Sequence, residues 1–418
     1  MKKHLTLSIA VAAALTLCAC GSTQPPVSQE NEQPATVPVQ DIGSPAPVKE
    51  DNSNDFRKYV SNTYISTGNN YCVDKAESVT YRAYFPVEES GSLEYRFYFS
   101  NTVDSTYDDG THGHAGQTGG NYTIESAFIS DGGTSPDEEP TGRTAVTFGG
   151  SAEKSVSPGE AYWSDPVTFD VPEGHFLVWE WTVTGENIPA THMSNLTKTG
   201  ADYGDDKGFV YCDQIPLPQL IGAQRDVGLR ITAIGDSITQ GCQTEPSAYE
   251  FWAARIAQQL GSDYGFWNCG LGWSRTSDIA YCGDWLSRAS QADVVIVAFG
   301  TNDIVSGEYG GDGGNTADEI DGYLRTVVSE LKNSGCSVIV FNAPPEDYRE
   351  NMETVRIEYN AKLKSTCEEL GVTLFDFASL LSTEAEPAHA LYGGHPNGEG
   401  GQIVADAFIS QFSAFLGT

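Results

Sequence analysis

The hydrophobic pattern of this 418-residue chain changes at Pro216-Leu217-Pro218. Beyond that point, short apolar runs alternate with longer amphipathic stretches. The apolar runs are 231–234, 264–267, 294–299, 338–341 and 372–375, and the amphipathic stretches are 249–260, 317–332, 352–370 and 403–415. Continuous apolar strands separated by helices predict a parallel sheet with helices on both faces. We therefore expect a three-layer α/β/α domain over residues 228–418.

Residues 56–222 show a different pattern. Short runs rich in aromatic and β-branched residues are separated by polar turns, and they cover 78–85, 93–99, 122–129, 144–148, 167–171 and 176–184. Many short strands with polar turns are typical of an antiparallel sandwich. We expect an all-β, jelly-roll-like sandwich in front of the α/β domain, which gives two domains and an α/β fold class.

The N-terminal segment has the features of an export signal. Lys2 and Lys3 precede an apolar stretch that is too short to span a bilayer. The run Leu17-Cys18-Ala19-Cys20 resembles a bacterial lipobox, which implies a lipoprotein-type signal over residues 1–20 and lipidation of Cys20. An ordinary cleaved signal peptide is the alternative. Residues 21–55 are rich in Ser, Pro, Gln and Glu, which predicts a flexible linker. We expect a lipid-anchored protein of the bacterial cell surface.

Charge and cysteine content narrow the classes of partner. The formal net charge of −34 disfavours nucleic acid and anionic membranes, so we expect membrane contact only through the anchor.

Seven cysteines lie beyond the signal, an odd number that leaves at least one unpaired. Cys72 and Cys212 bracket the sandwich and could pair. No Cys-x-x-Cys occurs, and His112 and His114 fit a polar loop better than a metal site. We expect a monomer.

Three polar side chains follow or approach the same predicted edge of the parallel sheet. Ser237 comes directly after the first apolar run, and Asn302 follows the third. Because active sites of such sheets lie beyond the carboxyl ends of the strands, these two side chains are expected to lie close together. His395, near the end of the chain, adds an imidazole. A hydroxyl, a carboxamide and an imidazole are the groups that acyl transfer needs, although Ser237 alone would fit a turn or helix cap.

The blocks 235–241, 300–303 and 395–396 resemble the SGNH, or GDSL-type, hydrolase family. The resemblance covers residues 228–418 and implies a central parallel sheet between two helical layers. It implies that Ser237 is the nucleophile and His395 the general base. It also implies an oxyanion hole made by the Ser237 N–H, the Asn302 side chain and a glycine N–H. The glycine is expected to be Gly272, with Gly270 as the alternative.

One position departs from the family pattern. The family usually has an aspartate three residues before the histidine, and Tyr392 stands there in this chain. The order of sandwich and SGNH domain is similar to carbohydrate acetyl esterases of the second carbohydrate-esterase family, which can work with a Ser–His dyad. We expect a dyad. A main-chain carbonyl of residues 391–394, or the carboxylate of Glu384 or Glu386, could orient the imidazole instead.

These observations favour a serine esterase that removes short acyl groups, foremost acetyl, from a polysaccharide or glycan. The reaction needs no metal and no organic cofactor. Asp236 and Asp303 are expected to support the loops. Trp267, Trp273 and Trp285 could line an acceptor cleft, but the sequence favours core positions for them. The alternatives are a lipase or thioesterase of the same family and an inactive surface protein that binds glycans.

Overall fold

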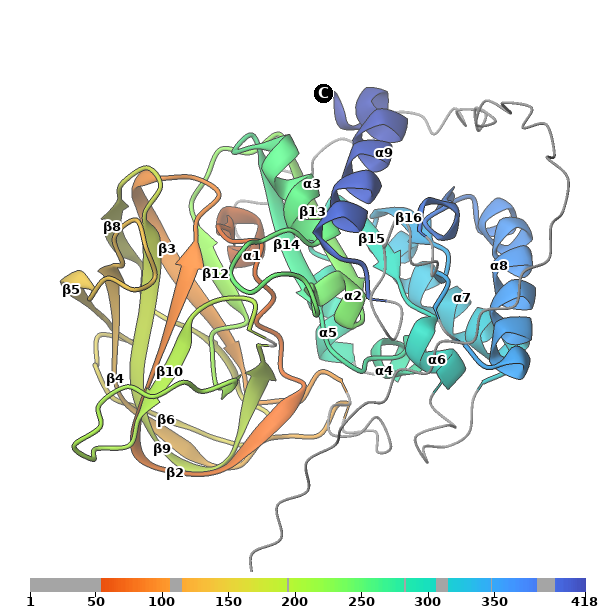
Figure 1. Cartoon of the computed structure of the whole chain (residues 1–418). Coiled ribbons are helices and arrows are strands. Elements are labelled where there is room, and N and C mark those ends of the chain that lie inside the picture. Colours follow the sequence, from red (N-terminus) through yellow and green to blue (C-terminus); the bar gives the residue numbers. More distant parts are fainter. Residues whose placement is uncertain are drawn as a thin grey trace, which may run out of the picture. The chain divides into compact units, whose positions relative to one another are not determined.

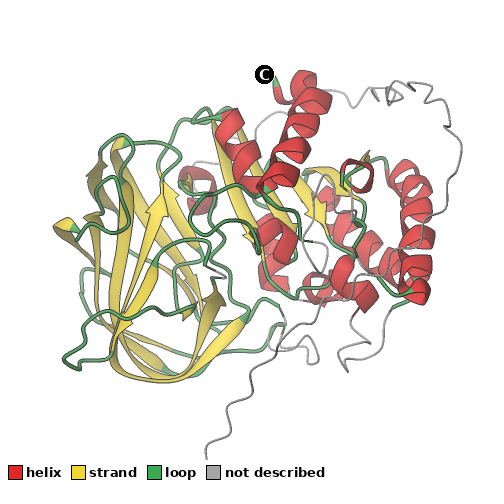
Figure 2. Ribbon diagram, viewed as in Figure 1, coloured by secondary structure: helices red, strands yellow, loops and turns green. Residues whose placement is uncertain are grey.

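The computed structural model describes residues 54–105, 115–193, 195–281, 283–305, 315–346, 348–381 and 395–418. These residues belong to one compact unit that spans residues 41–418. The predicted export signal, the lipidated Cys20 and most of the predicted linker lie outside the described residues, as do His112 and His114. Figure 2 shows a first half built of strands and a second half rich in helices.

The first half contains two antiparallel sheets that follow the short helix α1 (Asp55–Lys58). In the first sheet the strand order is β1-β12-β3-β7, and β8 also pairs with β3. In the second sheet the order is β10-β2-β9-β4-β5, with β11 on β9 and β6 on β4 (Figure 1). The strands of the first sheet are β1 (Val60–Ser61), β3 (Gly91–Ser100), β7 (Ala161–Trp163), β8 (Val167–Val171) and β12 (Leu220–Ala223). Those of the second are β2 (Tyr71–Pro86), β4 (Tyr122–Asp131), β5 (Thr141–Val146), β6 (Lys154–Val156), β9 (Phe176–His192), β10 (Thr199–Asp202) and β11 (Gln214–Ile215).

Aromatic side chains fill the space between the two antiparallel sheets. Phe97 and Phe99 of β3 meet Trp179 and Trp181 of β9, with ring centroids 4.6 Å apart for Phe97–Trp179 and 5.3 Å apart for Phe99–Trp181. In each strand the two rings are two residues apart, because successive side chains of a strand point to opposite faces of the sheet. The predicted all-β sandwich is confirmed.

The second half is built on a five-stranded parallel sheet of order β14-β13-β15-β16-β17. Its strands are β13 (Leu229–Gly235), β14 (Tyr264–Gly270), β15 (Val294–Ala298), β16 (Ser337–Phe341) and β17 (Thr373–Phe375). The helices are α2 (Ser237–Gln240), α3 (Trp252–Leu260), α4 (Thr276–Tyr281), α5 (Gly283–Ala289), α6 (Thr301–Val305), α7 (Ala317–Asn333), α8 (Glu350–Leu370) and α9 (Gly398–Leu416), with a 3₁₀ turn at Ala378–Leu380. All five predicted strands and all four predicted helices are present.

Alternate residues of each parallel strand pack on opposite helical layers. Ile231 and Ala233 of β13 belong to the core cluster that contains α3 and α9, while Ile234 belongs to the cluster that contains α5, α7 and α8. Figure 1 shows α3 and α9 side by side, in agreement with their contacts. The predicted three-layer α/β/α arrangement is confirmed. Its strand order places a topological switch point beside β13, where ligands bind in such sheets.

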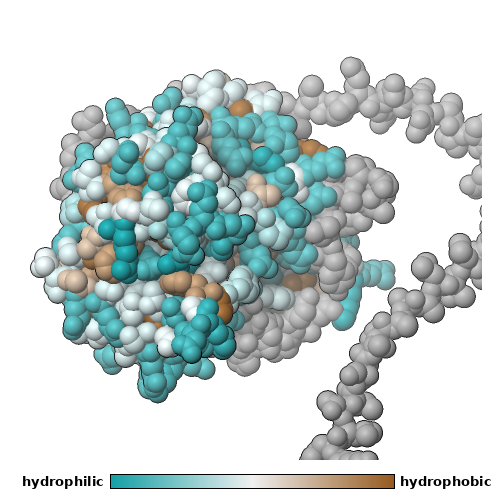
Figure 3. Space-filling model, turned by 60° about the vertical axis from the view of Figure 1, so that its left-hand side comes forward, coloured by the Kyte–Doolittle hydropathy of each residue, from teal (hydrophilic) through white to brown (hydrophobic). Residues whose placement is uncertain are grey.

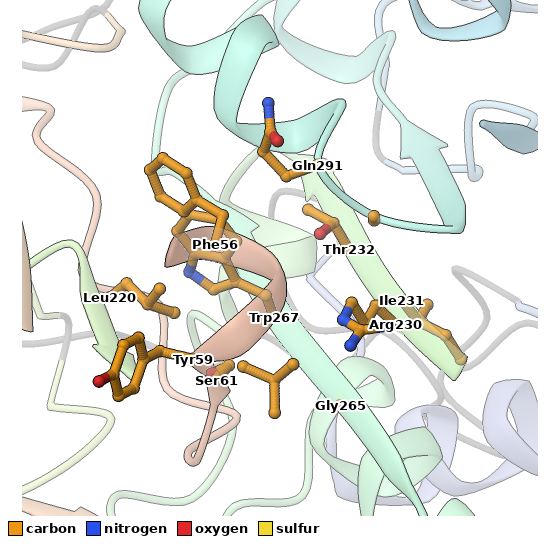
Figure 4. Close-up of a pocket in the computed structure, with 12 residues that line it drawn as sticks. Phe56, Tyr59, Ser61, Leu220, Arg230, Ile231, Thr232, Gly265, Trp267 and Gln291 are labelled. Carbon is orange, nitrogen blue, oxygen red and sulfur yellow. The ribbon is translucent and has the colours of Figure 1, made fainter. Parts of the chain in front are cut away.

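The sandwich packs directly on the β14 edge of the parallel sheet. Phe56 of α1 stacks on Trp267 of β14 with 6.0 Å between ring centroids, and Figure 4 shows both rings beside Leu220 of β12. The pocket between them has a volume of about 20 Å³, which is room for about one water molecule and no substrate. β12 ends at Ala223 and β13 begins at Leu229, and the predicted domain limits at residues 222 and 228 lie next to these two ends.

The disulfide considered for Cys72 and Cys212 is not formed. Neither cysteine forms a disulfide, nor does any other cysteine that the structure describes, while Cys282 lies outside the described residues. Cys72 lies within β2 opposite Pro189 of β9, whereas the Cys212 thiol donates to the Gln214 carbonyl oxygen at 3.1 Å.

The surface of the sandwich is largely hydrophilic. Figure 3 shows small, separate hydrophobic patches on the face turned toward the viewer. Among the described residues, the exposed large hydrophobic side chains are Tyr203, Val210, Tyr211, Tyr281 and Ile357. None of the described helices combines the length and the apolar character that a membrane span requires.

Candidate active site

Ser237 lies at the first residue of α2, directly beyond the end of β13. Asp236 caps this helix, since its Oδ1 accepts a hydrogen bond from the Ile238 N–H at 2.9 Å. Gly235 is required before the turn, because a Cβ there would lie 2.1 Å from Thr239 Oγ1 and 2.5 Å from the Ala298 carbonyl oxygen. The strand, the glycine and the cap together fix the serine at the edge of the sheet.

His395 reaches the serine from the segment before α9. Its Nε2 lies 2.7 Å from Ser237 Oγ, although the two residues are 158 positions apart in the sequence. Asn397 caps α9 by accepting from the Gly400 N–H at 2.9 Å, which fixes the backbone two residues after the histidine. A hydroxyl within hydrogen-bond reach of an imidazole is the arrangement of an activated nucleophile and its base.

The groups considered for orienting His395 lie outside the described residues. They are Tyr392, Glu384, Glu386 and the carbonyl groups of residues 391–394. The Ser–His dyad therefore stays a prediction.

Asn302 lies on α6, at the end of the neighbouring strand β15. It is 7% exposed, and its Nδ2 donates to the Ser274 carbonyl oxygen at 3.0 Å. Because an amide nitrogen carries two hydrogens, this bond orients the carboxamide and leaves one N–H for another acceptor. That remaining N–H suits a negative charge developing on a carbonyl oxygen.

The structure gives the two candidate glycines other acceptors. The Gly272 N–H donates to Gln240 Oε1 at 2.9 Å, and the Gly270 N–H donates to Asn268 Oδ1 at 2.9 Å. Gly272 nevertheless lines the same cavity as Ser237. Its place in the oxyanion hole stays a prediction.

Ser237, Asn302 and His395 share one open cavity of about 430 Å³. The expectation of a core position was wrong for Trp273, which lines this cavity with a backbone φ of 64°. The expectation of a core position is confirmed for Trp285, which is 1% exposed. Among the described residues, the lining consists of His192, Asn195, Asp213, Ser237, Cys242, Gln243, Thr244, Pro246, Gly272, Trp273, Asn302 and His395.

The sandwich also gives residues to this cavity, and the sequence did not predict a functional role for them. His192 is the last residue of β9, and Asn195 and Asp213 lie in the connections that follow it. The predicted strand stops at residue 184 because Gly185, Glu186 and Asn187 interrupt the apolar pattern. To predict that His192 reaches the cavity, the strand would have to be extended through this polar interruption up to residue 192.

Two buried carboxyl groups hold the loops around the nucleophile. Asp303 is fully buried and accepts from both the Thr276 N–H and the Thr276 hydroxyl at 2.9 Å. Burial raises the pKa of Asp303 to about 6 and that of Asp236 to about 7. Desolvation disfavours the charged form of each group, and the hydrogen bonds that they accept offset only part of it.

Asp236→Asn is expected to gain stability relative to the wild type as the pH rises from 5 to 8. An ordinary aspartate in the unfolded chain loses its proton near pH 3.9, whereas Asp236 in the folded protein keeps it up to about pH 7. The folded state binds more protons across that window, so this group makes folding less favourable as the pH rises. Asparagine caps a helix equally well but does not titrate.

Urea denaturation at both pH values gives the free energy of unfolding of each protein. The difference, variant minus wild type, should increase by at least about 1 kcal/mol between pH 5 and pH 8. A difference that does not change with pH would contradict the raised pKa of Asp236.

Within the described ranges, no three His, Cys, Asp or Glu side chains gather in a way that could hold a metal ion.

Comparison with known proteins identifies a family for part of the chain. The model of the GDSL-like Lipase/Acylhydrolase family matches residues 233–403, a range that includes Ser237, Asn302 and His395. No curated protein sequence matches the chain.

Solved structures resemble the same half of the chain. LAE5, an alpha/beta hydrolase enzyme from the metagenome of Lake Arreo, Spain, is 19% identical, with 45% of this chain and 97% of that chain covered and a TM-score of 0.39. A member of the lipolytic protein G-D-S-L family from Veillonella parvula is 22% identical, with 44% and 98% covered and a TM-score of 0.37. A catalytic mutant of Axe2, an acetylxylan esterase from Geobacillus stearothermophilus, is 20% identical, with 44% and 94% covered and a TM-score of 0.37.

Proposed function

We propose that this chain, whose residues 233–403 form a GDSL-like lipase/acylhydrolase domain, is a serine esterase that removes acetyl groups from carbohydrate. The observation that carries the proposal is the 2.7 Å contact between His395 Nε2 and Ser237 Oγ in an open cavity. A serine hydroxyl is a weak nucleophile by itself and needs a base at this distance.

The proposed reaction uses Ser237, His395 and Asn302. Ser237 Oγ attacks the carbonyl carbon of the ester while His395 Nε2 takes the hydroxyl proton. The Asn302 amide and the Ser237 N–H stabilise the oxyanion of the tetrahedral intermediate. The bond to the alcohol breaks as His395 gives the proton to the leaving oxygen. Water then attacks the acyl-enzyme with His395 as base, which releases the acid and restores the serine.

The composition of the cavity lining supports a hydroxylated alcohol. Among the described residues, polar side chains outnumber apolar ones in the lining, and a sugar hydroxyl can form hydrogen bonds with them. The volume of about 430 Å³ suits a ligand of one or two sugar rings.

The test is hydrolysis of p-nitrophenyl esters of increasing chain length, followed by acetate release from an acetylated xylooligosaccharide. We expect kcat/KM to be highest for the acetyl ester and at least about tenfold lower for the octanoyl ester, because a cavity of about 430 Å³ has to hold the alcohol part of the ester as well as the acyl group. A rate that rises steadily from acetyl to octanoyl would support the lipase or thioesterase alternative. Glycan binding without turnover of any ester would support the inactive alternative.

A further inference from the structure

The candidate catalytic cavity contains a second imidazole besides that of His395, and this one comes from the sandwich and is paired with a carboxylate. His192 Nε2 is in direct polar contact with Asp213 Oδ2, and both residues line the cavity together with Ser237 and His395. We propose that the His192–Asp213 pair binds the sugar on the alcohol side of the ester. This inference rests on the proposed function and gives the sandwich a direct part in substrate recognition.

The backbone that carries His192 is fixed to the nucleophile loop by one buried side chain. Gln240, the last residue of α2, donates from Nε2 to the His192 carbonyl oxygen at 2.7 Å and accepts from the Gly272 N–H at 2.9 Å. Gln240 is fully buried. On the other side, the His192 N–H donates to Asn70 Oδ1 at 3.0 Å. His192 is therefore held at a set position relative to Ser237, as a binding group requires.

Asp213 is also held in place. Its Oδ1 accepts from the Asn195 N–H at 3.3 Å. Burial opposes the charge of Asp213, but the hydrogen bond and charge of His192 lower the pKa of the carboxyl overall. The side chains of His192 and Asp213 keep 21% and 24% of their surface exposed, so both remain accessible to a ligand.

The chemistry of the pair fits a sugar hydroxyl. The proposed reaction uses His395 as its base and leaves His192 without a part in proton transfer. A hydroxyl both donates and accepts, and hydrogen bonds to a carboxylate or imidazole with ionic character are the stronger ones. Tyr211 is 60% exposed and hydrogen-bonds Asp213, so an aromatic ring lies next to the pair. Such a ring offers an apolar face with a polar tip, which suits the mixed surface of a sugar.

The chain offers a matched control for this pair. His175 Nδ1 lies 2.8 Å from Asp131 Oδ1, also in the sandwich, with side-chain exposures of 26% and 22%. Neither residue is part of the cavity lining. His175→Gln therefore repeats the chemistry and burial of the change His192→Gln away from the site.

The experiment measures both variants on two substrates, p-nitrophenyl acetate and a partially acetylated xylooligosaccharide with free hydroxyls. His192→Gln should lower kcat/KM for the oligosaccharide by at least about tenfold, mainly through KM, and change that for p-nitrophenyl acetate by less than about twofold. The same variant should weaken inhibition of p-nitrophenyl acetate hydrolysis by the deacetylated oligosaccharide. His175→Gln should match the wild type on both substrates.

Equal losses on the two substrates, or no loss on either, would overturn the inference. If His192→Gln fails to fold, Asp213→Asn serves as a second test variant. It should also lower kcat/KM for the oligosaccharide much more than kcat/KM for p-nitrophenyl acetate. If the wild type hydrolyses p-nitrophenyl acetate but no acetylated sugar, the carbohydrate part of the proposed function and this inference both fail while the esterase stands. If the wild type hydrolyses neither, the proposed function itself fails.

Discussion

Ser237→Ala is expected to lower kcat for p-nitrophenyl acetate by at least about 10⁴-fold. The variant removes the hydroxyl that forms the acyl-enzyme in the proposed reaction, while it leaves His395, Asn302 and the cavity in place. The remaining oxyanion donors can still bind the ester, so KM should change much less than kcat. Steady-state kinetics at pH 8 with both proteins at equal concentration gives the comparison.

Cys242→Ala is the matched control for the nucleophile. Cys242 contributes a thiol to the cavity lining, which could in principle attack a carbonyl carbon, and it lies five residues beyond Ser237. Its thiol hydrogen-bonds Gln240 Oε1 at 3.4 Å. We expect this variant to keep most of the wild-type kcat. The reverse pattern, with activity lost in Cys242→Ala and kept in Ser237→Ala, would show that the serine assignment is wrong.

Arg288→Met is expected to lower the free energy of unfolding by about 3–5 kcal/mol. Arg288 of α5 forms an ion pair of 2.6 Å with Asp104, which follows β3 of the sandwich. Asp104 is fully buried and Arg288 is 4% exposed. Asp104 also accepts from the Asn69 N–H at 3.0 Å and from Gln219 Nε2 at 3.2 Å. Removal of the arginine leaves a buried carboxylate without its cation.

A double variant separates loss of the pair from loss of packing. Asp104→Asn combined with Arg288→Met should be more stable than Arg288→Met alone, because no uncompensated charge stays buried. Lys198→Met serves as the control, since Lys198 pairs with Asp137 at the surface and its loss should leave the urea midpoint unchanged. Urea unfolding is followed by tryptophan fluorescence, which reports on both halves, and by helical circular dichroism, which reports mainly on the α/β half. Single-variant and double-variant midpoints that coincide would contradict a contribution from the buried charge.

The sequence determined the secondary structure of the α/β half and the place of two of its polar groups. The apolar runs at 231–234 and 294–299 mark β13 and β15 because strands buried on both faces need continuous apolar residues. Ser237 and Asn302 follow these strands within a few residues, so the parallel topology alone puts them at one edge. The short helices α2, α4, α5 and α6 were not predicted, since each is too short to show a helical period.

Only the tertiary structure decided which distant segments meet. It brought His395 within 2.7 Å of Ser237 and gave the Gly272 N–H a partner in Gln240. It also continued β9 through a polar interruption to His192, which carried the sandwich into the cavity. Local side-chain pattern fixes which face of a strand or helix is buried. Contacts between segments depend instead on how whole layers pack against each other, and no short stretch of sequence contains that information.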